Sequence, residues 1–285
     1  MAHIPMFSMS AFSDIILPAM EIAGAETICE IGVEFGGMSQ LLADHCESKG
    51  GQLISVDPEP KFEFVAWAAA NAHVRHVPLP SAEAFQTLHD IDAWVVDGDH
   101  NWYTVFYELT AMEAISKRDG KPFLAFMHDV CWPCGRRDTY YAPDRIPEEY
   151  RQPFDYEHGI RPGDPYSHFR SGFKGEGFFA FAKEEGGPRN GVKTAIEDFI
   201  DVQLQEGRTL AYAEVPAVFG LGVLFDMDAT WSGALADLVM PYHENELLAR
   251  MERNRIETFI RVIDHEDKDR FGTPVPPQRF VQGEG

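Results

Sequence analysis

The sequence has few cysteines, few basic side chains and no long apolar run, and each shortage excludes a class of protein. Four cysteines in 285 residues are too few for a disulfide framework and agree with a reducing compartment. Lys and Arg number 24 against 46 Asp and Glu, and the formal net charge of −22 argues against binding to nucleic acid or to anionic membranes. The longest apolar stretches, 64–74 and 212–225, contain polar residues and are too short to span a bilayer.

The N-terminal residues and one pair of cysteines give two further expectations. Residues 1–9 carry no basic segment ahead of their apolar residues, so we expect no secretory signal and a cytoplasmic protein. Cys131 and Cys134 have the spacing of a redox motif or half a zinc site, but no second pair completes a tetrahedral site. We therefore favour a structural role for this pair.

Alternating apolar and helical patterns predict an α/β fold with a doubly wound, mostly parallel sheet. Each of five apolar segments is followed by residues at helical spacing, which implies right-handed crossovers and helices on both faces of the sheet. The segments expected as strands are 27–32, 53–56, 73–77, 92–96 and 123–127. After residue 129 the pattern changes, and residues 131–176, rich in Pro, Gly, Tyr and Arg, are expected to form a long irregular insertion that acts as a lid.

The remaining chain completes one expected domain. Regular structure resumes with a helix over 191–199 and an antiparallel edge pair over 210–215 and 218–225. An amphipathic helix over 247–263 is a candidate for joining subunits into a homo-oligomer. We divide the chain into an N-terminal helical segment, a cofactor-binding half, a lid, a segment with the remaining helix and edge strands, and a C-terminal helix with tail: 1–24, 25–130, 131–176, 177–230 and 231–285.

Residues after the first two predicted strands indicate a nucleoside-binding site. In open parallel sheets, ligands bind outside the carboxyl ends of the strands. Gly32 and Gly36 allow a tight turn ahead of a helix N-terminus with free amides. Asp57 lies 21 residues beyond Gly36, close to the offset of about 20 residues at which a carboxylate meets a ribose hydroxyl.

Glu34 decides which nucleoside fits. A dinucleotide-binding fingerprint that starts at Gly32 needs glycine at position 34, and a carboxylate there repels a pyrophosphate. A cationic sulfonium ligand with an amino-acid tail removes this objection.

Three motifs carry a resemblance that runs from Thr27 to Asp129. They are Ile-Gly-Val-Glu-Phe-Gly-Gly-Met-Ser at 31–39, Val-Asp-Gly-Asp-His at 96–100 and Met-His-Asp-Val at 127–130. Together they resemble the class I S-adenosylmethionine-dependent methyltransferases, and within them the small-molecule and sugar O-methyltransferases that include the macrocin-type enzymes. The resemblance implies S-adenosylmethionine as cofactor, bound by Glu30, Gly32, Glu34, Gly36, Ser39, Asp57, Ser81, Ala82 and Asp97.

The resemblance also assigns roles within that cofactor site. Glu30, Gly32, Gly36 and Ser39 would surround the methionine moiety and Asp57 the ribose. Ser81 and Ala82 would flank the adenine, although Pro80 stands where the family often has an acidic residue.

Acidic and imidazole side chains at the fourth and fifth strand ends are the candidate catalytic groups. By the resemblance, Asp97 and Asp129 would hold a divalent metal (Mg, Mn or Fe) and Asp99 would be the base. His128 stands where a carboxylate is expected, and as a third ligand it would favour metals other than Mg. His100 is a competing base, and a mechanism without metal stays open.

The insertion supplies candidate acceptor contacts. Trp132, Tyr140 and Tyr141 are expected to form walls of the acceptor site. Arg136 and Arg137 could bind an anionic group of the acceptor through bidentate hydrogen bonds, or could pair with neighbouring acids instead.

We therefore expect a methyltransferase that acts on an oxygen of a small polar acceptor, a sugar or sugar-containing metabolite. Three alternatives remain at this point: an N-methyltransferase, a nicotinamide-dependent oxidoreductase, which Glu34 disfavours, and a protein that binds the cofactor without catalysis.

Overall fold

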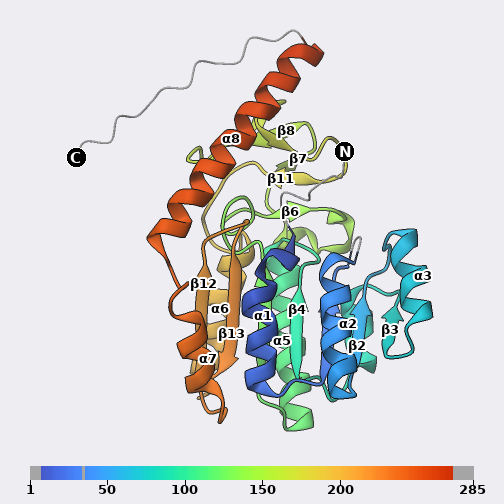
Figure 1. The fold of residues 1–285 in the computed structure, drawn as a ribbon. Helices are drawn as coiled ribbons and strands as arrows, with labels where there is room; N and C mark the ends of the chain where they lie inside the picture. Colours follow the sequence, from blue (N-terminus) through green and yellow to red (C-terminus); the bar gives the residue numbers. More distant parts are fainter. Residues whose placement is uncertain (1–7, 34–35, 272–285) are drawn as a thin grey trace.

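A seven-stranded sheet forms the centre of the computed structural model, which describes residues 8–33 and 36–271 (Figure 1). The strand order is β12-β13-β5-β4-β1-β2-β3, and β1 to β5 are parallel. The strands are β1 Thr27–Ile31, β2 Gln52–Val56, β3 Val74–Val77, β4 Ala93–Val96, β5 Leu124–His128, β12 Leu210–Val215 and β13 Leu221–Asp226. The predicted class of fold and all five parallel strands are thus confirmed.

Helices cover both faces of the sheet, because successive side chains of each strand point to opposite sides and most of them are apolar. One core lies between the sheet and α1, α2, α3 and α7; the other lies between the sheet and α4, α5 and α6. The helices are α1 Ser13–Ala23, α2 Gly37–Lys49, α3 Phe62–Ala70, α4 Ser81–Ala84, α5 Trp102–Asp119, α6 Val192–Gln205, α7 Ser232–Val239 and α8 Glu246–Phe271. The short 3-10 turns are η1 Met9–Phe12, η2 Phe85–Thr87, η3 Pro143–Arg145 and η4 Glu148–Tyr150.

The predicted antiparallel pair is confirmed at one edge of the sheet. The antiparallel strand is β13, which lies second from the edge and pairs with both β5 and β12. The edge strand β12 runs in the same direction as β5, because the short turn between β12 and β13 reverses the chain a second time.

The insertion is more ordered than the sequence predicts. It contains two three-stranded sheets, in the orders β6-β11-β7 and β10-β8-β9, so the ordered unit continues beyond residue 176. Its strands are β6 Thr139–Tyr140, β7 Phe154–Asp155, β8 His158–Ile160, β9 His168–Phe169, β10 Phe173–Lys174 and β11 Ala180–Ala182. Strands of two or three residues are too short to give a periodic hydrophobic pattern, which explains why the sequence indicated irregular structure.

Asp138 is a buried hub that fixes the insertion to the helices behind the sheet. Its carboxylate accepts hydrogen bonds from the backbone amides of Trp102 and Gly191, both at 2.7 Å, and from the hydroxyl of Tyr140 at 2.7 Å. Burial nevertheless raises the pKa of Asp138 to about 6. The insertion is therefore anchored to the start of α5 and the start of α6.

Helix α8 crosses the insertion and extends beyond it (Figure 1). Ile256 and Ile260 are buried in a small cluster with Phe219, and Asp264 and Asp267 form ion pairs with Arg161 and Lys174 of the insertion. The predicted C-terminal helix is confirmed, with these contacts made inside one chain, and its role in joining subunits stays a prediction. In the part of the chain that the structure describes, no helix is long and apolar enough to cross a membrane.

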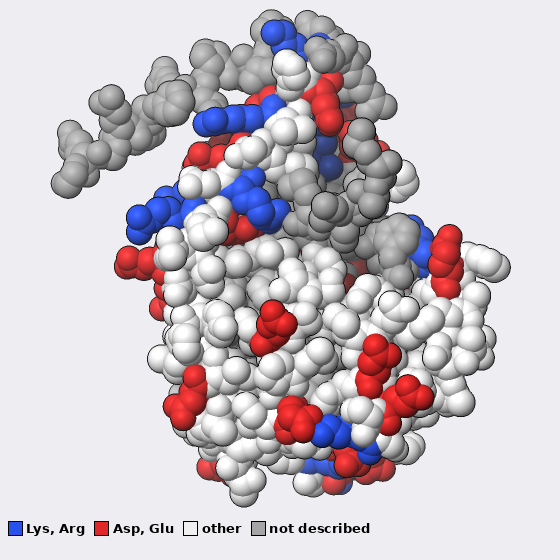
Figure 2. All heavy atoms as spheres, viewed as in Figure 1, with Lys and Arg blue, Asp and Glu red and all other residues white. Residues whose placement is uncertain are grey.

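Charge is unevenly spread over the surface. Figure 2 shows Lys and Arg gathered in the upper part of the view, where α8 and the insertion lie, whereas the helices below present mainly Asp and Glu. The insertion and α8 thus form the less acidic end of a strongly acidic molecule.

The first testable prediction concerns Gly32, where β1 meets β4. Gly32 has φ +83°, and a Cβ there would lie 2.3 Å from the backbone oxygen of Asp97. We expect Gly32→Ala to lower the free energy of unfolding by about 3 kcal/mol or more, from positive φ and the clash with backbone. Urea denaturation measures this loss.

Gly24→Ala is the matched control. Gly24 also has positive φ (+65°), but nothing lies within 4 Å of its added Cβ, so it should lose only about 1 kcal/mol. Equal losses for the two variants would show that the strand ends are not closely packed at Gly32.

Candidate functional site

The predicted glycine turn and Asp57 lie together at the carboxyl ends of β1 and β2. Asp57 Oδ2 accepts the backbone N–H of Val33 at 3.0 Å, and Oδ1 accepts that of Glu59 at 2.8 Å. Gly36 has φ +78° and begins α2 without a capping side chain. The first amides of α2 are therefore not satisfied by a side-chain cap at this turn. Glu34, predicted to contact the cofactor, lies outside the described residues.

Glu30 and Ser39 form a buried pair beneath this turn. The Ser39 hydroxyl donates to Glu30 Oε2 at 2.6 Å, and the Ser55 hydroxyl donates to the same oxygen at 3.0 Å. Burial raises the pKa of Glu30 to about 8, although both hydroxyl groups lower it. The pair ties β1 to β2 and to the start of α2.

Ser81 and Ala82 begin the short helix α4, directly after β3. Burial raises the pKa of the buried Glu108 of α5 to about 8, although the nearby Ser81 side chain lowers it. Glu108 Oε2 has no hydrogen-bond partner among the described residues. The sequence did not single out Glu108, because it occupies one position of an ordinary amphipathic helix.

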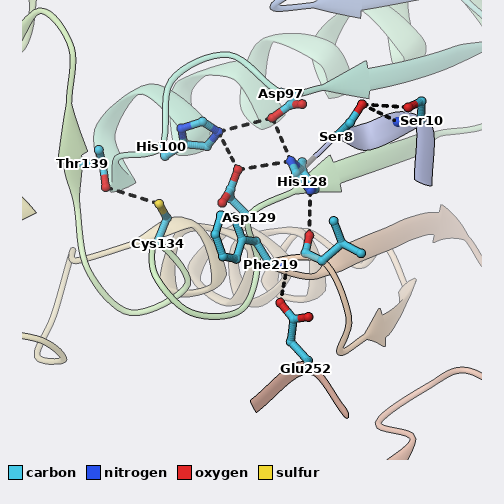
Figure 3. Close-up of polar contacts among 11 residues, drawn as sticks. Ser8, Ser10, Asp97, His100, His128, Asp129, Cys134, Thr139, Phe219 and Glu252 are labelled. Atoms are coloured by element: carbon cyan, nitrogen blue, oxygen red, sulfur yellow. Dashed lines mark hydrogen bonds and ion pairs between the residues drawn. The ribbon is translucent and has the colours of Figure 1, made fainter. Parts of the chain in front are cut away.

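Four side chains form a compact polar cluster at the ends of β4 and β5, which we call the Asp–His quartet: Asp97, His100, His128 and Asp129 (Figure 3). Asp97 Oδ1 lies 3.0 Å from His128 Nδ1 and 3.4 Å from His100 Nε2. Asp129 Oδ2 lies 3.0 Å from His100 Nε2 and 3.2 Å from His128 Nδ1. Each carboxylate thus contacts both imidazoles.

The quartet adjoins the glycine turn. Asp97 N donates to Ile31 O at 2.8 Å, and the backbone of Asp97 closely faces Gly32. Helix α5 is capped by Asn101, whose side chain accepts the Thr104 amide at 2.9 Å. Because Asn101 supplies the cap, Asp97 is used in the quartet rather than as a helix cap.

Charge pairing dominates the electrostatics of the quartet. Burial lowers the pKa of an imidazole, but Asp129 and Asp97 outweigh it and raise the pKa of His100 to about 10. The same carboxylates raise the pKa of His128 well above its usual value. Burial opposes ionisation of Asp97 and Asp129, yet the two histidines hold both carboxyl pKa values below their ordinary range. At neutral pH the quartet therefore holds two negative and two positive charges.

His128 is also held from its other side. Its Nε2 lies 2.9 Å from the backbone oxygen of Val218. Since a carbonyl oxygen can only accept, Nε2 carries a proton, and Nδ1 faces Asp97 and Asp129.

All four quartet members were predicted from the sequence to act in catalysis or metal binding, but in a different arrangement. The described residues that could hold a metal ion together are Asp97, His100 and Asp129, whose ligand atoms all lie within 4.8 Å of one another. The sequence named His128 in the place that His100 takes in this group. Asp99, the predicted base, accepts a 3.5 Å hydrogen bond from Thr104 and forms no hydrogen bond or ion pair with the quartet. Burial raises its pKa, although the nearby His100 lowers it.

The N-terminal segment also contributes to the site, which the sequence did not predict. Phe12 lies edge-on to His128, with ring centroids 6.0 Å apart. Ser8 and Ser10 are joined at 2.7 Å between their hydroxyl oxygens, and a Cβ at Gly37 would lie 3.7 Å from Ser8 Oγ. The turn η1 thus packs over the start of α2 beside the quartet (Figure 3).

Of the three aromatic residues predicted as acceptor walls, Tyr141 keeps that position. Its ring lies 5.9 Å from that of His100, and 47% of the residue is exposed. Tyr140 is fully buried, with its hydroxyl on Asp138, so its predicted role is corrected to a structural one. Trp132 packs against Phe173 and Phe219, each with a centroid distance of 5.9 Å.

Both predicted acceptor-binding arginines are used inside the protein. Arg136 donates to both carboxylate oxygens of Glu197 on α6, at 2.5 and 2.6 Å. Arg137 is 1% exposed and donates to the carbonyl oxygens of Ala182 at 2.6 Å and Pro165 at 2.9 Å. We therefore correct the expectation that these guanidinium groups bind the acceptor: they fix the insertion. The four cysteines are free thiols, and Cys134 contacts the Thr139 hydroxyl.

A comparison with protein families gives a match over part of the chain. Residues 29–130 match a family model described as a methyltransferase domain. The matched segment begins within β1 and contains β2 to β5 and all four residues of the quartet. No curated protein sequence matches the chain.

Several solved structures are similar to the chain at low identity. A methyltransferase of Podospora anserina bound to SAH is 12% identical, covering 79% of this chain and 83% of that chain, with a TM-score of 0.46. An O-methyltransferase of Bacillus cereus in complex with SAH is 14% identical, covering 77% and 81%, with a TM-score of 0.44. The O-methyltransferase TomG of Streptomyces achromogenes is 14% identical, covering 76% and 79%, with a TM-score of 0.43.

The family match covers the strands and turns that form the candidate site. Residues 29–130 are similar to a methyltransferase domain, and they lie in a mostly parallel sheet with helices on both faces.

The second prediction follows from the raised pKa of Glu30. Between pH 5 and 8 the folded protein keeps a proton on Glu30 that the unfolded chain has lost, so the free energy of unfolding falls as pH rises. Glu30→Gln has no titrating group at this position. We therefore expect the variant to lose this fall in the free energy of unfolding, on the order of 3 kcal/mol between about pH 5 and 8, and to show a flatter pH dependence. Urea denaturation at several pH values between 5 and 8.5 measures the slope.

Glu59→Gln, which changes an exposed carboxylate near the same turn, is the control and should keep the wild-type slope. A wild-type slope in Glu30→Gln as well would show that Glu30 is ionised in the folded protein.

Proposed function

We propose that the protein transfers a methyl group from S-adenosylmethionine to an oxygen atom of a small polar acceptor. The observation that carries this proposal is the Asp–His quartet, located beside the glycine turn at the same edge of the sheet. Methyl transfer is an in-line displacement, so the protein must hold the acceptor oxygen, methyl carbon and sulfur in line. A proton-accepting or metal-binding centre next to the donor site suits this task.

The glycine turn and Asp57 support the cofactor part of the proposal. In it, the uncapped first turn of α2 binds the carboxylate of the methionine moiety, because helix amides and the helix dipole favour an anion. Asp57 binds the ribose hydroxyl groups, and Ser81 with Ala82 lies beside the adenine. Glu30 and Ser39 support the turn from beneath.

An oxygen acceptor explains the quartet better than a nitrogen acceptor does. A hydroxyl group has a pKa near that of water, about 16, and is a poor nucleophile until its proton is removed. A neutral amine already carries a lone pair and needs no such centre. The quartet therefore favours O-methylation over the N-methylation that the sequence left open.

The raised pKa of His100 determines when this residue can act as a base. His100 is protonated at neutral pH in the quartet and cannot accept a proton in that state. Added positive charge at this site, from the sulfonium or from a cation, lowers an imidazole pKa and favours the neutral ring. A neutral His100 keeps its proton on Nε2, which faces Asp129 and Asp97, so Nδ1 can accept the acceptor proton while the two carboxylates stabilise the imidazolium that forms.

The donor set also fits a divalent metal. Asp97, His100 and Asp129 offer one nitrogen and two carboxylate oxygens, a mixture that suits Mn or Fe better than Mg. A bound ion would lower the pKa of the acceptor hydroxyl group. In that state, Nε2–H of His128 stays on Val218 while Nδ1 faces the carboxylates.

The acceptor part of the proposal is a neutral polar molecule, with a sugar as the favoured class. Tyr141 presents a half-exposed aromatic ring next to His100, which suits the apolar face of a sugar ring. Because Arg136 and Arg137 are used by the protein, an anionic group on the acceptor is no longer required. Residues 25–130 would then bind the cofactor and the insertion would form the acceptor side.

The third prediction separates cofactor binding from metal binding by mutation. We expect Asp57→Ala to weaken S-adenosylmethionine binding at least about tenfold, because the ribose loses its carboxylate partner. Asp92→Ala is the matched control: Asp92 accepts the Glu26 and Thr27 amides at the opposite end of β1, so its variant should bind the cofactor as wild type does. Calorimetric titration measures both.

Asp129→Asn tests the metal part with Mn²⁺ as the probe. We expect it to lower Mn²⁺ affinity at least about tenfold in electron paramagnetic resonance titrations, because an anionic ligand is replaced by a neutral amide. Undiminished Mn²⁺ binding in this variant, or no Mn²⁺ binding by the wild type, would leave the histidine as base and contradict the metal centre. Equal cofactor affinity in Asp57→Ala and wild type would contradict the cofactor site.

A further inference from the structure

The turn between β12 and β13 contains three consecutive residues with left-handed backbone. Val218, Phe219 and Gly220 have φ values of +46°, +66° and +98°. Only the glycine adopts this conformation readily, and the backbone of the other two residues is strained. Surrounding contacts must therefore hold Val218 and Phe219 in place.

The strained turn directs two carbonyl oxygens toward donors at the end of β5. The Val218 oxygen accepts Nε2–H of His128 at 2.9 Å, and the Phe219 oxygen accepts the Cys131 amide at 2.8 Å. Both partners follow or end β5, next to Asp129. The turn is thus the second support of the quartet, on the side away from the glycine turn.

The turn is held by α8, through Glu252. Glu252 Oε1 accepts the Phe219 amide at 2.9 Å, and this contact is buried (Figure 3). Arg255 donates to Glu252 at 2.7 and 2.6 Å, and its guanidinium lies 5.1 Å from the centre of the Phe219 ring. Burial would raise the pKa of Glu252, but Arg255 and the Phe219 and Val218 amides keep it lowered, so Glu252 is ionised.

These contacts form one continuous path from a surface helix to the quartet. A carboxylate that accepts the Phe219 amide fixes the peptide planes of the turn, because two neighbouring left-handed residues direct their amides to the same side. The fixed turn aims the Val218 oxygen at His128. Without that acceptor, no contact at Nε2 would fix the orientation of the His128 ring.

We propose that Glu252 is a positioning residue for the quartet: through the strained Val218–Phe219 turn it holds the Val218 oxygen on Nε2–H of His128 and so directs Nδ1 of that ring toward Asp97 and Asp129. The inference rests on the proposed function only in that the quartet is taken as the reacting centre; the geometry of His128 is a property of the protein alone. Docking of α8 is therefore part of assembling the site.

The experiment reads the ring of His128 directly, at one fixed pH, in protein treated with EDTA. Long-range ¹H–¹⁵N spectra of protein labelled with ¹⁵N-histidine distinguish protonated from unprotonated ring nitrogens, and His128→Gln identifies the resonance among 11 histidines. We expect a protonated Nε2 in the wild type. In Glu252→Ala we expect exchange of this proton with water to be at least about tenfold faster.

Two further variants should give smaller changes in the exchange rate of the His128 proton than Glu252→Ala does. Glu252→Gln keeps an oxygen acceptor for the Phe219 amide and should retain a spectrum close to wild type. Arg255→Ala loosens Glu252 without removing it and should give an intermediate exchange rate. If Glu252→Ala does not fold, the comparison of Arg255→Ala with Glu252→Gln decides the question.

Asp264→Ala is the matched control. It removes another ion pair between α8 and the insertion, that with Arg161, but has no contact with the turn. A His128 spectrum equal to wild type in this control, and altered in Glu252→Ala, supports the proposal. Unchanged His128 exchange in Glu252→Ala and Arg255→Ala, or equal changes in Asp264→Ala, would overturn it.

The His128 spectra test the positioning role of Glu252 whether or not the protein transfers methyl groups. Titration of S-adenosylmethionine into the same samples should give wild-type affinity, within about twofold, in Glu252→Ala, because the glycine turn and Asp57 are untouched. Failure of the wild type to bind the cofactor would refute the proposed function, while the His128 spectra would still support or refute the positioning role.

Discussion

Balanced charge within a buried space is the constraint on which the candidate site depends. Two carboxylates and two imidazoles share contacts of 3.0 to 3.4 Å, and each carboxylate contacts both rings. Buried charges are tolerated when they are paired and hydrogen-bonded, and removal of one partner leaves the others uncompensated. A cation at this centre can therefore bind only if protons leave, which couples the protonation of His100 to binding.

The rest of the molecule supports this cluster from three directions. The parallel sheet brings Asp97 and His128 to neighbouring strand ends, and Gly32 lies against the backbone of Asp97. The turn η1 places Phe12 against His128. The strained turn at Val218, held by α8, supports the other side of that ring. Secondary elements from the beginning, middle and end of the chain thus converge on one imidazole.

The sequence was sufficient for the parts of the fold that depend on local pattern. Continuous apolar segments ending in glycine or aspartate predicted β1 to β5, and this order placed Gly32, Asp57, Asp97 and Asp129 at one edge of the sheet. It could not place partners that are distant in the sequence. The pairing of Arg136 with Glu197, the burial of Tyr140 under Asp138 and the contact of Glu252 with Phe219 depend on how the insertion and α8 dock, and short strands carry no periodic pattern.

Calorimetric titration of S-adenosylmethionine into EDTA-treated wild-type protein, repeated with Mg²⁺, Mn²⁺ and Fe²⁺, tests the central claim most directly. The account predicts binding at a single site in the absence of metal, and a heat of binding that changes with Mn²⁺ or Fe²⁺ more than with Mg²⁺. No binding of S-adenosylmethionine under any of these conditions would contradict the account, because the glycine turn, Asp57 and the quartet would then not form a donor site.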